Sequence, residues 1–123
     1  MSTADASVQA AVAQARRWYW QRISAMVLAL CVGLHLAGMV WAVRGGLSAA
    51  EILSRTQGNE IFAVFYAVFV LACAVHVPIG LAAIAREWWR LSAPAAAWLA
   101  RAVTALFVGL GVRAVWGVYG GGV

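Results

Sequence analysis

The sequence predicts an all-α integral membrane protein with three transmembrane helices, and its composition and hydropathy pattern both support this. Of its 123 residues, 65% are hydrophobic and 11% are charged, whereas soluble domains are about half apolar and a quarter charged. A chain this short cannot bury so much apolar surface in one soluble core. Three apolar runs, over about 20–43, 61–85 and 95–118, reach the roughly 20 residues that a helix needs to cross a bilayer.

The segment before the first apolar run is not itself predicted to cross the membrane. Residues 1–15 are expected to form a flexible or interfacial tail, and residues 16–123 a single three-helix membrane domain. The tail has neither the basic start nor the apolar centre of a secretory signal. The first apolar run is therefore predicted to stay in the protein as a membrane span.

Local signals mark where the helices begin and end. Gly45-Gly46 is expected to end the first span, because glycine tolerates the left-handed conformation of a helix cap. Ser48 followed by Glu51 is a capping-box pattern, which predicts a short interfacial helix of one or two turns. Asn59 is expected to cap the second span, and Pro94 suits the first turn of the third.

The arginine distribution predicts the orientation. Nine Arg and four acidic residues give a charge of +5. Most of these Arg lie before the first span or around the second connection: Arg16, Arg17, Arg22, Arg86, Arg90 and Arg101. The positive-inside rule then predicts a cytoplasmic N-terminus and a periplasmic C-terminus in a bacterial inner membrane. Because the Arg residues flank the apolar runs, membrane topology accounts for the positive charge. The expected partner is therefore the lipid bilayer, and nucleic acid is not expected to bind.

The only two histidines, His35 and His76, each lie inside an apolar run. An ionisable side chain at this depth points to a function, and imidazole is a common ligand of haem iron. Both are therefore candidate haem ligands, and hydrogen bonding within the helix bundle is the alternative. Span lengths place them about 5–8 Å apart along the membrane normal. No CxxCH motif is present, so covalent haem attachment is not expected.

A second group of candidates lies at the cytoplasmic end of the first span. Trp20, Arg22 and Ser24, together with Gln21, combine aromatic surface with hydrogen-bond donors. Such a group suits a ring that carries carbonyl oxygens, as a quinone does. In the alternative interpretation, Arg22 is a topology charge and Ser24 bonds back to its own helix.

Two motifs resemble those of a known family. They are Gln21-Arg22-Ile23-Ser24 at the start of the first span, and His76-Val77-Pro78-Ile79-Gly80-Leu81 followed by Glu87-Trp88. The chain resembles, over about residues 17–90, the cytochrome b membrane anchors of succinate dehydrogenase and fumarate reductase. This resemblance implies haem b on His76 and a quinone near Arg22 and Ser24. It also implies docking of an iron–sulfur subunit and an FAD-containing flavoprotein, with electron transfer alone assigned to the anchor.

The chain departs from the family pattern in two respects. Ala82-Ala83 stand where the family often has Arg-His, so Arg86, Arg44 and Arg113 become the candidate partners of a haem propionate. Arg113 has the alternative of extending to the membrane interface. His35 has no counterpart in many one-haem anchors. His35 and His76 therefore either share one haem or each pair with a histidine of a second membrane-anchor chain.

Two further function classes remain open from the sequence. One is a haem-free structural anchor that binds quinone. The other is a small transporter subunit, for which the spans offer few polar groups apart from the two histidines.

Overall fold

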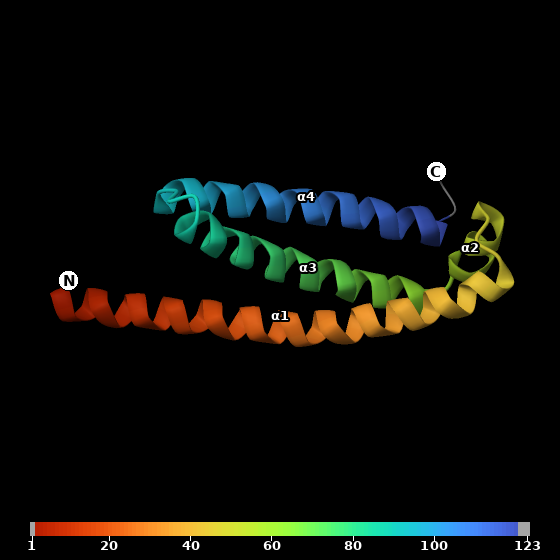
Figure 1. Cartoon of the computed structure of the whole chain (residues 1–123), viewed down its shortest axis with the longest axis horizontal. Helices are drawn as coiled ribbons and strands as arrows, with labels where there is room; N and C mark the ends of the chain where they lie inside the picture. The colour runs from red at the N-terminus through yellow and green to blue at the C-terminus, as the bar shows by residue number, and fades with distance from the viewer. Residues whose placement is uncertain (1, 121–123) are drawn as a thin grey trace.

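The computed structural model describes residues 2–120, and within this range it is built from helices alone. These are α1 (Thr3–Gly45), α2 (Ala49–Thr56), α3 (Glu60–Glu87) and α4 (Ala93–Gly120). The three long helices are each long and apolar enough to cross a membrane. The predicted all-α membrane fold with three spans is thereby confirmed. Figure 1 shows α3 running between α1 and α4, antiparallel to both.

The first helix is much longer than its apolar run. At about 1.5 Å per residue, the 43 residues of α1 extend about 64 Å, roughly twice the ~30 Å hydrocarbon core. A capping box between Ser2 and Asp5 starts the helix, so most of the segment predicted as a flexible or interfacial tail is helical. Its side chains are exposed almost throughout, and because α1 is one continuous helix this part extends beyond the apolar run.

The first connection is a compact cap over the end of α4. Gly46 adopts a φ of 97° after α1, and Ser48 and Glu51 form the predicted capping box at the start of α2. The Thr56 hydroxyl donates to the Val118 carbonyl oxygen at 3.0 Å, and the Gly58 amide donates to Tyr119 at 2.9 Å. The predicted short helix is confirmed, and these bonds tie it to α4.

Small residues bring the long helices together. The buried apolar residues are Cys31, Ala72, Ala74, Ala85 and Ala96. Large apolar side chains such as Leu30 (64% exposed) and Leu71 (61%) point outward instead. Membrane helices pack closely through small residues, since lipid already solvates the large ones. The exposed apolar surface therefore suits a membrane environment.

Candidate functional site

His76 lies in the seam between α1 and α3 and faces a hydroxyl of the opposite helix. Its Nδ1 is 3.4 Å from the Oγ of Ser24, which is buried. The Ser24 hydroxyl itself donates to the Gln21 carbonyl oxygen at 3.1 Å. Because the Gln21 carbonyl oxygen can take the hydroxyl proton, Ser24 can accept from the Nδ1–H of His76. That arrangement corresponds to the tautomer in which Nε2 keeps its lone pair.

His35 makes a similar contact elsewhere in the same seam. Its Nδ1 is 3.4 Å from the Oη of Tyr66 on α3. The rings of Tyr66 and Phe69 pack edge-on against the imidazole, with centroids 5.8 and 5.9 Å away. A phenol hydroxyl both donates and accepts, so either histidine tautomer satisfies this pair. The surroundings of His35 therefore do not select the tautomer that a metal needs.

The two histidines occupy different levels of the seam. Ser24 and His35 are eleven residues apart on α1, and Tyr66 and His76 are ten apart on α3, so the two pairs lie about 15 Å apart. Two ligands of one metal ion have nitrogens about 4 Å apart, because each metal–nitrogen bond is about 2 Å long. The arrangement favours two separate ligand positions over one haem shared within the chain.

The predicted depth difference of about 5–8 Å is therefore wrong, and the reason lies at Trp88. Span lengths alone do not give how far Trp88 lies beyond the level of Trp20. Gly80 faces Gln21 across the seam, which puts Trp88 about eight residues, or roughly 12 Å, beyond that level. The end of α3 thus projects past Trp20, and His76, four residues from Gly80, lies only about 6 Å inside that level.

The glycines near the two histidines have different roles. A Cβ on Gly80 would lie 3.1 Å from Nε2 of Gln21, so Gly80 lets α1 and α3 approach next to His76. A Cβ on Gly33 or Gly38 would meet no described atom within 4 Å. Glycine at position 80 is therefore explained by close packing of α1 and α3. Gly33 and Gly38 lie on an open surface of α1 near His35, where no packing contact requires glycine.

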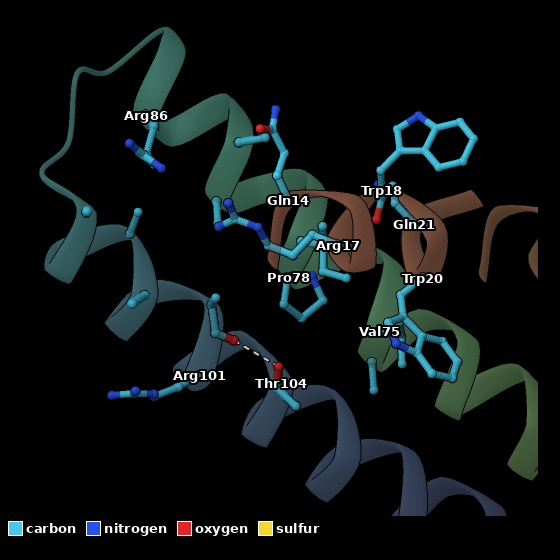
Figure 2. Close-up of a pocket in the computed structure, with 18 of the residues that line it drawn as sticks. Gln14, Arg17, Trp18, Trp20, Gln21, Val75, Pro78, Arg86, Arg101 and Thr104 are labelled. Atoms are coloured by element: carbon cyan, nitrogen blue, oxygen red, sulfur yellow. Dashed lines mark hydrogen bonds between the residues drawn. The ribbon is translucent and has the colours of Figure 1, made fainter. Parts of the chain in front are cut away.

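A groove of about 1600 Å³ opens between α1, α3 and α4, at the end of the bundle where the chain begins (Figure 2). Trp20, Gln21 and Arg22 contribute to its α1 wall. The Arg22 guanidinium lies 5.0 Å from the centre of the Trp18 ring. Of the residues predicted to hold a quinone, Trp20 and Arg22 therefore share the groove. Ser24 lies deeper in the seam, against His76.

Sequence reasoning missed two arginines of this region. Arg17 and Arg101, which had been interpreted only as topology charges, line the groove together with Arg86. Gln21 has a buried Oε1 with no hydrogen-bond partner among residues 2–120. The spacing of Gln21 and Ser24, three residues apart and so on one helix face, was the available signal for a polar seam.

The three candidate propionate partners lie in different places. Arg86 lines the groove, ten residues beyond His76 on α3. Arg44 lies in the last turn of α1. Gly111 packs against Val70, so Arg113 lies level with Val68, close to the level at which Phe69 contacts His35. The structure therefore puts Arg86 at the groove end of the bundle, and Arg44 and Arg113 toward the His35 end.

The donor set fits a haem better than a metal ion held by protein alone. Within residues 2–120, no three His, Cys, Asp or Glu side chains come together in a metal-binding group. Haem iron is held in its porphyrin and requires from the protein only axial ligands such as histidine. An isolated imidazole with a free Nε2 and a bonded Nδ1 meets that requirement.

No protein-family model, curated protein or solved structure matches this chain.

Proposed function

We propose that this chain is a haem b-binding membrane anchor of a succinate:quinone oxidoreductase, that is, of a succinate dehydrogenase or fumarate reductase. One observation supports the proposal: the His76 Nδ1 lies 3.4 Å from the buried Ser24 Oγ, a contact that orients the ring and leaves Nε2 for a ligand. The motifs around Arg22 and His76, which resemble those of such anchors, support the same assignment.

In this proposal, haem b carries single electrons through the membrane domain when bound. His76 would hold the haem iron, and Ser24 would keep its ring in the ligating orientation. A second membrane-anchor chain would supply the other ligand, because His35 lies about 15 Å away along the seam. His35 would then hold a second haem together with that partner chain. Arg86 is the candidate propionate partner near His76, and Arg44 and Arg113 are the candidates near His35.

Quinone is the proposed substrate at the groove. Trp20 offers an aromatic face to the ring, and the Arg22 guanidinium is a charged donor for a quinone oxygen. Ser24 is the link between this site and His76, since it lies one turn inward from Gln21 and bonds the imidazole. An iron–sulfur subunit would supply electrons to the quinone, and a flavoprotein would carry out the dicarboxylate chemistry.

The proposed orientation has the groove end in the cytoplasm of a bacterium and the α2 cap in the periplasm. The arginines of the groove support it through the positive-inside rule. Exposed Ser7 and Ser54 mark the two ends. A membrane-impermeant thiol reagent applied to intact cells should label Ser54→Cys, whereas Ser7→Cys should react only after lysis. The reverse pattern would overturn the orientation.

The haem assignment is tested by removing one histidine at a time from the assembled complex. His76→Ala should lose the haem at the groove end, and His35→Ala should spare that haem, as measured by haem-to-protein ratio. Full haem content in His76→Ala would remove this residue from the ligand set. Arg22→Ala should slow quinone reduction while keeping haem content, and unchanged quinone reduction would refute the quinone assignment.

A haem-free, quinone-binding anchor is the second candidate. The observation that favours it is that both histidines have hydrogen-bond partners within the chain. In that case both single-histidine variants would leave the absorbance spectrum unchanged and quinone reduction would still depend on Arg22.

A further inference from the structure

We propose that the groove between α1, α3 and α4 binds an anionic phospholipid, with its phosphate among Arg17, Arg86 and Arg101 and an acyl chain along the alanine-rich walls. This inference goes beyond the proposed haem and quinone functions and does not require either of them. It rests on how charge and apolar surface are arranged along the groove.

The basic residues gather at one end of the groove. Four arginines and one glutamate line it, namely Arg17, Arg22, Arg86, Arg101 and Glu87. Gln21 faces Gly80, and Gly111 faces Val70, so Arg101 lies level with Gln21. Arg17 and Arg86 lie about 6 and 9 Å further out. Trp18, Trp20 and Trp98 lie in the same part of the bundle as these arginines. All three are exposed, and exposed Trp residues mark the headgroup region of a membrane.

Below Arg22, which is one residue deeper than the level of Arg101, the groove carries no charge among its described lining residues. Its α4 wall continues through Thr104, Ala105 and Val108, about 10 Å deeper than Arg101. The Thr104 hydroxyl already donates to the Ala100 carbonyl oxygen at 2.9 Å. Eight alanines line the groove: Ala74, Ala82, Ala83, Ala93, Ala96, Ala97, Ala100 and Ala105. Two of them, Ala74 and Ala105, lie deeper than Arg101, so the deep part of the groove is an apolar slot.

A phospholipid matches this gradient better than the other ligands of this membrane domain. Neither histidine belongs to the described lining of the groove, so the lining itself offers no haem ligand. A quinone held at Trp20 and Arg22 is neutral and brings no anion to Arg17, Arg86 and Arg101, so the lipid is proposed beside the quinone and not in its place. An acidic segment of another protein would match the arginines but not the slot that continues into the membrane. Basic pockets between helices on the cytoplasmic side are known to bind anionic headgroups.

The test uses the purified full chain with the subunits that co-purify, reconstituted in phosphatidylcholine vesicles that contain a minor fraction of phosphatidylglycerol. After detergent extraction, lipid that stays bound is counted per chain by native mass spectrometry. Wild type should retain phosphatidylglycerol over phosphatidylcholine. The variant R17Q/R86Q/R101Q should retain roughly tenfold less, whereas R16Q/R44Q/R113Q, which loses the same three charges elsewhere, should retain as much phosphatidylglycerol as wild type. Equal loss in both triple variants would reduce the effect to bulk electrostatics and overturn the proposal.

A steric variant tests the slot without changing charge, and it remains informative if the triple variant does not fold. Ala105→Phe fills the apolar part of the groove, four residues deeper than Arg101, and Ala102→Phe adds the same ring at an exposed position outside the lining. Ala105→Phe should reduce retained phosphatidylglycerol, and Ala102→Phe should not. Equal retention in these two variants would overturn the acyl-chain slot. Glycerol phosphate carries the headgroup charge without acyl chains, so displacement of the lipid by glycerol phosphate would overturn the slot as well.

Discussion

At the scale of single residues, the two intramembrane histidines differ in what their neighbours allow. The Gln21 carbonyl oxygen can take the Ser24 hydroxyl proton, which lets His76 donate from Nδ1 and keep Nε2 free. Tyr66 does not favour either tautomer of His35. The resemblance of its motif already favoured His76 as a ligand. The hydrogen-bond geometry now gives a physical reason for this preference.

Replacing Ser24 tests whether its hydroxyl orients the His76 ring for haem binding. Ser24→Ala removes the group that orients the His76 ring, so we expect haem affinity to fall roughly 10–100-fold, measured by titrating haem into the haem-free complex. Ser24→Thr, which keeps the hydroxyl, should recover affinity. Ser54→Ala is the control, since its hydroxyl donates only to the Glu51 carbonyl oxygen in exposed α2. Wild-type affinity in Ser24→Ala would contradict the positioning role.

At the scale of elements, close approach between helices depends on particular glycines. A Cβ on Gly111 of α4 would overlap the side chain of Val70 on α3, whereas a Cβ on Gly109 would meet no described atom within 4 Å. The two positions share a helix and a residue type. They differ in whether a neighbour fills the space beside the backbone.

This difference predicts opposite outcomes for two matched variants. Gly111→Ala should lower the free energy of unfolding by about 1–3 kcal/mol, the usual range for overpacking. Gly109→Ala should be neutral or slightly stabilising, because alanine favours helix over glycine. Unfolding in mixed detergent micelles, followed by circular dichroism, measures both. Equal stabilities would show that α3 and α4 do not pack at Gly111.

The short helix α2 should respond to pH through its cap. Hydrogen bonds from the Ser48 hydroxyl and then the Ser48 amide hold the pKa of the Glu51 carboxyl below its ordinary value near 4.5. A lowered pKa means that the carboxylate stabilises the folded cap above the unfolded-state pKa, and that this contribution is lost as pH falls through the folded-state pKa.

Amide hydrogen exchange in α2 measures the effect of this cap. Protection, corrected for intrinsic rates, should be constant from pH 7 to about 5 and should fall below about pH 4.5. Glu51→Gln carries no titrating group and should show low protection with no such step. A step that persists in Glu51→Gln would assign the pH response to another residue.

At the scale of the whole molecule, local rules predicted the elements but not their registration. Gly45-Gly46, Ser48 with Glu51, and Asn59 mark helix ends through interactions within a few residues, and the structure confirms them. The level of His76 depends instead on how α3 slides along α1, which is decided at contacts such as Gly80 with Gln21. No local pattern contains that information, so Trp88 was a misleading marker of depth.

The groove escaped prediction for a related reason. Arg17, Arg86 and Arg101 come from three different helices. The register of these helices brings the three arginines within about 9 Å of one another along the bundle axis. In the sequence, Arg17, Arg86 and Arg101 are separate flanks of apolar runs. Their shared position at one groove is a property of tertiary packing.

The central claim is that this chain holds haem b in the membrane, and an absorbance spectrum tests it most directly. The wild-type chain, purified with its co-purifying subunits, is reduced with dithionite, and the oxidised spectrum is subtracted. We expect a b-type difference band, with two haems for each copy of this chain if a second chain completes both the His76 and the His35 site. A difference spectrum without a b-type band would contradict the account.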